Sequence, residues 1–393
     1  MRINWFSNAP WASSGYGNQT RLFARRIKDL GHQVSITAFY GLEGAILNMD
    51  GMPVYPKGLQ PYGQDIMSAH ARNANADIIL SLIDAWVIDP RLNVHGIPWI
   101  PWFPVDSEPL PAPVKRAAAA AYKRIVFSRF GEKMVHDAGL DCYYVPHGCD
   151  TNVYKPMDQA EARTAVQFPQ DKFIVGMVAA NKGTPSRKAF MPQLKAFAEL
   201  QKRHGDCFLY LHTNRSERGE MEGVNLPEYL RFLGLQEGRD YGFPDPYLQM
   251  LGFPDAVMAA MYNAFDVKTL VSMGEGFGIP ILEAQACGCP VVVGDWTSMG
   301  ELCFSGWKVS KADAEPFWTP LAAYQYYPRS GAILEAYEAA YQMKGNQEYR
   351  TRAREGALAY DADRVTEKYW KPVLDDIGDH LADNAIATRK VAA

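Results

Sequence analysis

The chain has 393 residues, of which 48% are hydrophobic and 21% charged, a composition typical of a globular protein with a full core. At about 100–200 residues per domain, this length predicts two domains or three. No apolar run approaches the roughly 20 residues that cross a bilayer, and the first residues enter a strand-like segment rather than a signal peptide. The net charge of −4 gives no general affinity for polyanions. We therefore expect a cytoplasmic protein without membrane insertion.

Short β-branched or aromatic runs alternate with amphipathic helical stretches, a pattern typical of parallel α/β architecture. In chain order, the strands expected in the first half are 3–8, 33–40, 77–83, 99–105, 124–128 and 142–146. Helices are expected at 18–30 and at 113–122, which contains a run of five alanines.

The strand series stops in the polar stretch 148–170 and then restarts. In the second half we expect strands at 173–180, 208–213, 267–273 and 290–294, with helices at 192–202 and 256–262. This organisation predicts two doubly wound domains, 1–155 and 156–365, with ligands bound at the carboxyl ends of the strands. The tail from about Asp383 is expected to fray.

The clearest motif runs from Ser272 to Pro290, where a hydrophobic strand ends in a glycine-rich loop and a helix opens at Pro280. The loop presents backbone N–H groups at a helix N-terminus, which favours an anion site. Glu275 lies in the loop and Glu283 in the helix, so both could accept hydrogen bonds from sugar hydroxyls. The alternative is a plain strand–helix turn with both glutamates solvated.

The sequence from Glu275 to Glu283, Glu-Gly-Phe-Gly-Ile-Pro-Ile-Leu-Glu, resembles the donor-site motif of the family 4 retaining glycosyltransferases. Segments 128–131, 145–150 and 175–178 resemble other parts of that family in the same order, so the resemblance spans about residues 3–305. It implies the GT-B fold, in which two Rossmann-like domains face each other across a cleft. It also implies that a helix within 366–393 crosses back to the first domain.

The resemblance also implies a donor site for a nucleotide sugar, with UDP-glucose as the default and no other cofactor. Glu275 would contact the donor sugar near the reacting centre, and Glu283 would bind the nucleotide ribose. The diphosphate would meet Arg187 and Lys188, although the family's usual arginine position is close to Asn181 here. Sugar and diphosphate would also contact the backbone of Gly276, Phe277, Gly278 and Ile279.

A second glycine loop spans residues 8–20, after the first strand. Thr20 stands where the dinucleotide fingerprint needs its third glycine, which disfavours an NAD site. In GT-B enzymes this loop faces the donor, so Gly15 and Gly17 are candidate donor contacts. A tight structural turn remains the alternative.

Asp106 follows the strand at 99–105 and is a candidate catalytic residue, because a carboxylate could accept the proton of the acceptor hydroxyl. It could instead only orient the substrate, or form an Asx turn before Pro109. Asp361 and Asp363 resemble a metal-binding Asp-x-Asp pair, but their place at a helix start favours capping. We expect no metal site.

The sequence gives less information about the acceptor than about the donor. The opening segment 5–17 resembles glycosyltransferases encoded by bacteriophages, which favours hydroxymethylcytosine in DNA as acceptor. A flipped base could stack on four aromatic residues: Trp11, Tyr16, Trp102 and Phe103. A protein, glycan or lipid acceptor stays open, as does a non-catalytic sugar-nucleotide binding protein, although Glu275 argues for catalysis. The basic stretch 19–28 is either a solvated face or a contact for the phosphates of a nucleic acid or of lipid head groups. The sequence does not determine the oligomeric state.

Overall fold

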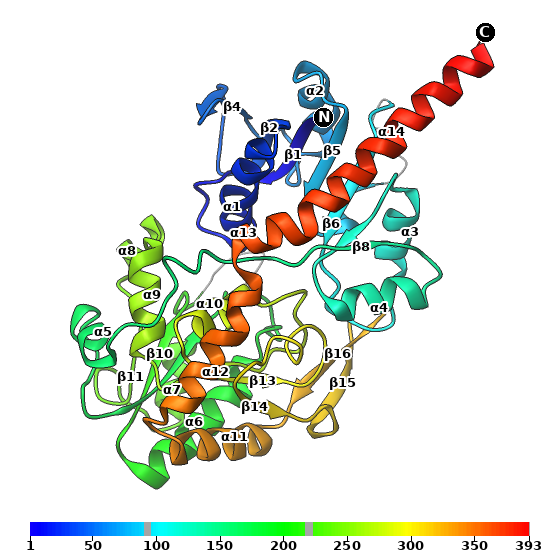
Figure 1. The fold of residues 1–393 in the computed structure, drawn as a ribbon. Helices are drawn as coiled ribbons and strands as arrows, with labels where there is room; N and C mark the ends of the chain where they lie inside the picture. Colours follow the sequence, from blue (N-terminus) through cyan, green and yellow to red (C-terminus); the bar gives the residue numbers. More distant parts are fainter. Residues whose placement is uncertain (90–95, 217–222, 393) are drawn as a thin grey trace. The chain divides into compact units, whose positions relative to one another are not determined.

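The computed structural model describes residues 1–89, 96–216 and 223–392, and the chain divides into two compact units (Figure 1). Unit 1 comprises Met1–Val105, Pro109–Gly148 and Tyr360–Ala393, and unit 2 comprises Asp106–Glu108 and Cys149–Ala359. The chain thus passes into unit 2 after Gly148, whereas the sequence placed the boundary after residue 155. It returns to unit 1 at Tyr360, slightly before the expected residue 366.

Unit 1 is built on an eight-stranded sheet of order β3-β4-β2-β1-β5-β6-β7-β8, in which only the β3–β4 pair is antiparallel. Its strands are β1 (Arg2–Asn8), β2 (Gln33–Tyr40), β3 (Leu47–Met49), β4 (Met52–Tyr55), β5 (Ile78–Leu82), β6 (Trp99–Phe103), β7 (Ile125–Val126) and β8 (Tyr143–Tyr144). The central strands β1, β5 and β6 are almost wholly buried, as expected for parallel strands covered on both faces.

Helices cover both faces of this sheet. They are α1 (Gly15–Asp29), α2 (Gln64–Asn73), α3 (Ala112–Ala120), α4 (Arg129–Asp137), α13 (Ala362–Val365) and α14 (Lys371–Ala392), with a 3-10 turn at Ala85–Val87 and a π-helical turn at Thr366–Trp370. On one face, the fully buried Trp370 packs against Trp5, Phe23 and Trp102. This aromatic cluster makes the C-terminal segment part of the core of unit 1.

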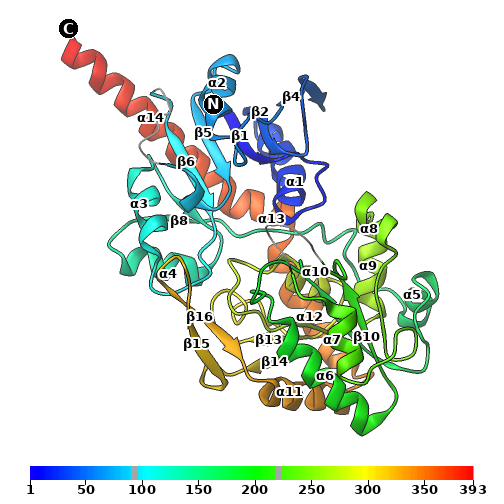
Figure 2. The ribbon, with the colours of Figure 1, turned by 180° about the vertical axis from the view of Figure 1, so that it is seen from behind.

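Unit 2 contains a six-stranded parallel sheet of order β11-β10-β9-β12-β13-β14, seen from behind in Figure 2, and a separate antiparallel hairpin, β15–β16. The strands are β9 (Phe173–Val178), β10 (Cys207–His212), β11 (Tyr241–Gly242), β12 (Val267–Leu270), β13 (Val291–Gly294), β14 (Gly306–Val309), β15 (Ala314–Trp318) and β16 (Tyr324–Pro328). The helices are α5 (Gln159–Ala165), α6 (Phe190–His204), α7 (Leu226–Phe232), α8 (Pro246–Leu251), α9 (Asp255–Ala264), α10 (Ile279–Ala286), α11 (Ser330–Gln342) and α12 (Gln347–Ala357), with 3-10 turns at Lys311–Asp313 and Leu358–Tyr360.

The strand order of unit 2 reverses between β9 and β12, because β10 lies on one side of β9 and β13 lies beyond β12. The chain leaves the carboxyl ends of these two strands in opposite directions, which opens a crevice in doubly wound sheets. The loops that follow β9 and β12 are therefore the expected place for a ligand. These loops contain Arg187, Lys188 and Glu275.

The start of one helix and the end of another differ from the sequence prediction. Helix α1 begins at Gly15 rather than at residue 18, because Ser14 caps it by accepting a hydrogen bond from the N–H of Gly17. Helix α14 continues to Ala392, where a frayed tail was expected. None of the described helices combines the length and the apolarity that a membrane span requires.

Candidate donor site in unit 2

The loop after β12 is held in place by the segment that follows β13. The indole N–H of Trp296 lies 3.1 Å from the carbonyl oxygen of Ser272 and 3.0 Å from that of Met273, and the hydroxyl of Ser298 lies 2.7 Å from two carbonyls of the loop. The hydroxyl of Thr297 accepts a hydrogen bond from the N–H of Glu275 at 3.1 Å. These bonds fix the backbone that carries Glu275.

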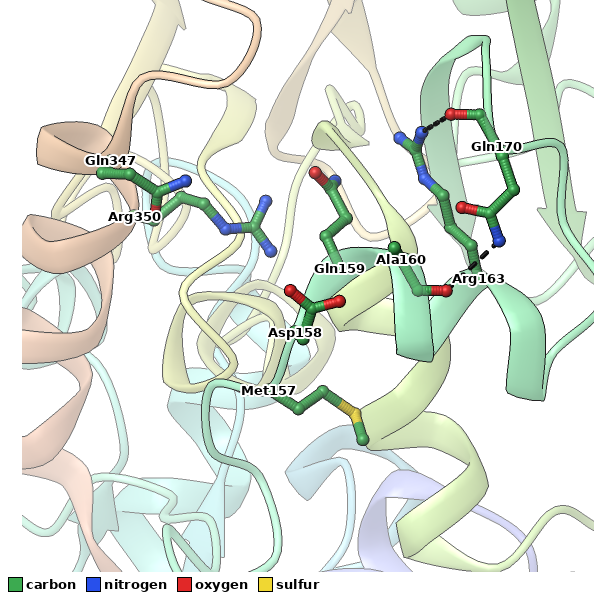
Figure 3. Close-up of a pocket in the computed structure, with 8 residues that line it drawn as sticks. All are labelled: Met157, Asp158, Gln159, Ala160, Arg163, Gln170, Gln347 and Arg350. Carbon is green, nitrogen blue, oxygen red and sulfur yellow. Dashed lines mark hydrogen bonds between the residues drawn. The ribbon is translucent and has the colours of Figure 1, made fainter.

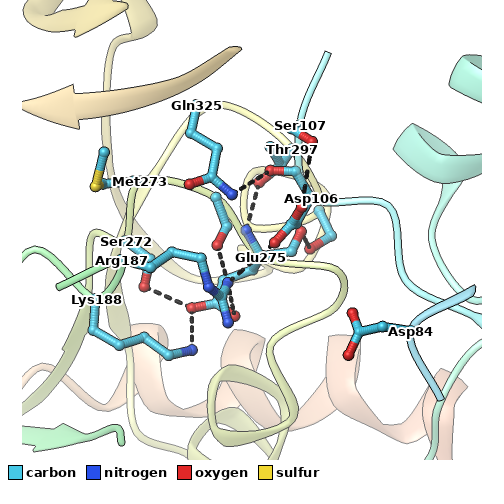
Figure 4. A network of polar contacts seen from close by, with 12 residues as sticks. Asp84, Asp106, Ser107, Arg187, Lys188, Ser272, Met273, Glu275, Thr297 and Gln325 are labelled. Atoms are coloured by element: carbon cyan, nitrogen blue, oxygen red, sulfur yellow. Dashed lines mark hydrogen bonds and ion pairs between the residues drawn. The ribbon is translucent and has the colours of Figure 1, made fainter. Parts of the chain in front are cut away.

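Glu275 is almost fully buried, with 5% of its surface exposed, and lies at the centre of a polar network (Figure 4). Its Oε1 accepts hydrogen bonds from Lys188 Nζ at 2.5 Å and from Ser272 Oγ at 2.6 Å. Its Oε2 lies 3.3 Å from Arg187 Nη1. Burial alone would raise the pKa of Glu275, but the charges of Lys188 and Arg187 and these hydrogen bonds bring it to about 2.

The two cations also contact other parts of the loop. Arg187, 40% exposed, donates to the carbonyl of Gly274 and lies 3.7 Å from a carboxylate oxygen of Asp106. Lys188 is more buried, and burial lowers its pKa while Glu275 opposes this change. The structure therefore brings four predicted residues together: Glu275, Asp106, Arg187 and Lys188.

Asp106 is placed by a short segment, Asp106–Glu108, that belongs to unit 2 although its neighbours in sequence belong to unit 1. Glu108 pairs with Tyr324 through two backbone hydrogen bonds, and its carboxylate binds Lys311 and the hydroxyl of Tyr326. A Cβ atom at Gly274 would lie only 2.1 Å from the carbonyl oxygen of Asp106. Glycine at 274 therefore lets Asp106 approach the loop of Glu275.

Helix α10 presents its N-terminus in the same loop. It begins after Gly278, whose φ of 109° favours glycine, and no side chain caps it. The predicted backbone contacts at Gly276, Phe277, Gly278 and Ile279 thus lie in the turn that leads into α10, where partial positive charge collects.

Glu283 lies deeper, one turn into α10, with 7% of its surface exposed. Tyr262 donates a hydrogen bond to its Oε2 at 2.9 Å. Burial raises the pKa of Glu283 to about 7, and the tyrosine hydrogen bond opposes this rise only in part. The carboxylate is thus neutral in a larger fraction of molecules than an exposed glutamate would be.

The structure shows the contacts of Asn181 and Asp361, two other residues considered from the sequence. Asn181 binds the backbone groups of Asn214 and Val224, so its side chain joins these two positions. Asp361 caps α13 by accepting from the N–H of Asp363, which confirms the capping interpretation. Among the described residues, no three His, Cys, Asp or Glu side chains gather as metal ligands.

Trp102 and Phe103 require a correction. Both are fully buried in β6, and Trp102 donates its indole N–H to the carbonyl of Val145. They cannot stack on a ligand, because β6 is an inner strand that is covered on both faces and ends only at Phe103. Trp11 is 45% exposed and Tyr16 is half-buried, so neither is enclosed as Trp102 and Phe103 are.

Gly17 also requires a correction. Its N–H is bonded to Ser14, and a Cβ atom would lie 2.2 Å from the carbonyl oxygen of Ala12, so this glycine serves the close packing of the helix start. Gly15 is exposed at the first position of α1. Its contact with a donor stays a prediction.

The sequence interpretation missed the residues that hold the loop: Ser272, Trp296, Thr297 and Ser298. Trp296, Thr297 and Ser298 follow the carboxyl end of β13, and this position is itself a signal for site residues in doubly wound sheets. Two buried hydroxyls at the same edge of the sheet, Ser186 and Thr213, have no hydrogen-bond partner in the described part of the chain.

A separate pocket of about 410 Å³ lies beside α5 (Figure 3). Its two arginines already bind the chain: Arg163 pairs with Asp266 and two carbonyl oxygens, and Arg350 binds two further carbonyl oxygens. These arginines stabilise the end of α9 and the turn after it, so we assign no ligand to this pocket.

Part of the chain is similar to known glycosyl transferases. Residues 173–321 match the family model of glycosyl transferases group 1. D-inositol 3-phosphate glycosyltransferase from Segniliparus rotundus is 26% identical over 227 residues, 53% of this chain and 47% of that protein. The enzyme of the same name from Saccharomonospora viridis is 31% identical over 204 residues, 51% of this chain and 46% of that protein. The chain spans about half the length of the curated relatives it matches.

Solved structures are similar over nearly the whole chain. Sucrose-phosphate synthase from Thermosynechococcus elongatus has a TM-score of 0.71 at 16% identity and covers 98% of this chain and 100% of its own. HepE from Anabaena, solved in complex with UDP-glucose, has a TM-score of 0.69 at 18% identity over 95% of this chain and 100% of its own. The chain therefore has the GT-B glycosyltransferase fold, and the part of unit 2 that carries the candidate site matches the glycosyl transferases group 1.

Proposed function

We propose that the chain is a retaining hexosyltransferase that moves a sugar from a nucleotide-sugar donor to an acceptor hydroxyl. The observation that carries the proposal is the cluster of Lys188, Arg187 and Glu275 at the switch point of a sheet whose sequence matches group 1. Two cations beside a helix N-terminus suit the diphosphate of a donor, whose leaving charge must be stabilised in the transition state.

In the proposed reaction, the bond between the sugar C1 and the donor phosphate oxygen breaks, and the acceptor oxygen bonds to C1 on the same face. The acceptor proton passes to the leaving phosphate. Arg187 and Lys188 neutralise the charge of that phosphate, so the proposed reaction needs no metal ion. Asp106 orients the acceptor or the sugar. Glu275 holds sugar hydroxyls near the reacting centre, and Glu283 accepts hydrogen bonds from the nucleotide ribose.

UDP-glucose is the first donor to test, since the structurally similar HepE binds UDP-glucose. The phage-type resemblance of segment 5–17 keeps hydroxymethylcytosine in DNA as one proposed acceptor, now with Trp11 and Tyr16 as its aromatic contacts. The cations of α1 do not support this acceptor: Arg25 pairs with Asp29 and Asp50, and Arg26 pairs with Asp363. Salt bridges of this kind leave less positive charge for the phosphates of DNA.

A small phosphorylated polyol is the second proposed acceptor, because two relatives carry the name of an enzyme that glycosylates D-inositol 3-phosphate. The two acceptors make different demands on the protein. DNA needs an extended cationic surface, whereas a polyol phosphate needs a few polar groups in one pocket.

The test is a mass measurement after incubation with UDP-glucose and each acceptor: duplex DNA with hydroxymethylcytosine, duplex DNA with cytosine, and inositol 3-phosphate. We expect a hexose gain on one acceptor, and a loss of at least about 100-fold in Glu275→Gln, because a buried polar contact to the reacting sugar is removed. Glu199→Gln, an exposed position on α6, is the matched control and should keep full activity. Donor binding without transfer to any acceptor or to water would instead identify a sugar-nucleotide binding protein.

A further inference from the structure

A buried lysine in the sheet has no place in the mechanism described above. Lys268 lies in β12, beside Gly176 of β9 and Val291 of β13, and its exposed fraction is 0%. Within the described residues its Nζ has no hydrogen-bond partner. An unpaired ammonium in a core costs several kcal/mol and has no structural benefit of its own.

The direction of the lysine follows from its neighbour in the strand. Thr269 points to the layer of α6 and α11, because its hydroxyl donates to Gln193 and accepts from Tyr337. Successive residues of a strand point to opposite faces, so Lys268 points to the layer that contains α10. Helix α10 carries Glu283 and begins at the loop of Glu275.

The charges around Lys268 are those of the donor site. Glu275, Glu283 and Cys289, just before β13, favour its charged form, and Lys188 disfavours it. Burial lowers the pKa of Lys268 to about 7. The lysine in turn favours the charged form of Glu283.

A bound donor makes this arrangement useful. Without a ligand, Glu275 is neutralised by Lys188 and Arg187. A diphosphate would draw both cations toward itself, and the buried carboxylate of Glu275 would then lose its partners. Lys268 is out of reach of solvent and its backbone is fixed in the strand, so its charge would still act on the two glutamates.

We propose that Lys268 is a positioning residue of the donor site, a buried counter-charge that favours the ionised forms of Glu275 and Glu283 while a nucleotide sugar occupies the loop. This inference rests on the proposed function. The positive charge of Lys268 would favour the ionised form of both carboxylates, which can then accept hydrogen bonds from the hydroxyls of the sugar and the ribose.

The test compares Lys268→Met, of similar length without charge, with the wild type. Because Glu283 also titrates near pH 7, kcat/KM for UDP-glucose is compared between the two proteins at each pH. At about pH 6 kcat/KM of Lys268→Met should be about tenfold lower than that of the wild type, and this difference should shrink as pH rises through about 7, because Lys268 loses its proton there. Lys195→Met, exposed on α6, is the matched control and should keep the wild-type profile.

Thermal unfolding gives a second readout that needs no substrate. Because the pKa of the folded form is below the ordinary value of 10.5, the cost of the buried charge is largest below pH 7 and falls as pH rises from 7 to 10.5. Lys268→Met should therefore raise Tm most at about pH 6. A lower Tm, a failure to fold, or an unchanged pH profile would overturn the inference. A wild type that does not turn over or bind any donor would instead contradict the proposed function, while the Tm comparison would still test the buried charge.

Discussion

At the scale of single residues, the site depends on a buried carboxylate and the two cations that pair with it. Glu275, Lys188 and Arg187 form ion pairs, and Glu275 has little contact with solvent. Removing one partner of such a pair lowers the free energy of unfolding, because the remaining partner is left with an unpaired charge. The same property suits the proposed function, in which the two cations would exchange one anion, a glutamate, for another, a diphosphate.

This pairing predicts how stability depends on pH. The pKa of Glu275 in the folded protein, about 2, is below its ordinary value of 4.5, so the group adds stability above pH 4.5 that is lost as pH falls through about 2. At neutral pH Glu275→Gln should reduce the free energy of unfolding by about 3 kcal/mol. The difference should shrink toward zero as the pH approaches 2, measured by urea unfolding at a series of pH values. A difference that stays constant with pH would contradict the ion-pair account, and Glu199→Gln serves as the exposed control.

At the scale of elements, three segments of unit 2 come together to form the site. The loop after β12 carries Glu275, the loop after β9 carries the two cations, and the segment Asp106–Glu108 lies against Gly274. At Gly274 the first and the last of these lie so close that a side chain would meet the carbonyl oxygen of Asp106.

Gly274→Ala should therefore displace Asp106, because the new Cβ would lie 2.1 Å from a backbone oxygen that Glu108 and Tyr324 hold in place. We expect a loss of about 1–3 kcal/mol in the free energy of unfolding and a lower kcat. Gly331→Ala is the matched control, since a Cβ at this position of α11 meets open space; alanine there should be neutral or stabilise by up to about 1 kcal/mol. Equal effects of the two substitutions, by urea unfolding and by kcat, would show that the approach at Gly274 is unimportant.

The strands of both sheets show what a sequence can predict. The long apolar runs at β1, β2, β9 and β10 coincide closely with the expected strands. The hairpin β3–β4 was missed, although its turn carried a signal: Asp50-Gly51, both with positive φ, is typical of a tight two-residue turn. The hairpin β15–β16 has exposed positions and a longer connection, so neither hydrophobic periodicity nor turn residues indicated it.

The site residues divide in the same way. The motif around Glu275 is local in sequence, so the residues of its loop could be predicted together. Trp102 and Phe103 were wrongly assigned because the sequence does not show whether a strand lies inside a sheet or where its last buried residue falls. Lys268 could not be recognised at all, since a lysine in an apolar run usually indicates an exposed position, and only the fold shows that both faces are covered.

At the scale of the whole molecule, the chain builds each unit from segments distant in sequence. Unit 1 is completed by residues after Tyr360, whose Trp370 lies among Trp5, Phe23 and Trp102. Unit 2 is completed by Asp106–Glu108, which carries a candidate catalytic residue. Neither unit is therefore a continuous piece of sequence, and the proposed donor site includes a segment from the first third of the chain.

The most direct measurement of the central claim is a calorimetric titration of the full chain with UDP, GDP and ADP. We expect one of these nucleoside diphosphates to bind at a single site. Lys188→Met should weaken this binding at least tenfold, whereas Lys195→Met should not, because Lys188 is the buried cation beside Glu275. Absence of saturable binding for all three nucleotides, or equal binding by Lys188→Met, would contradict a donor site at this loop.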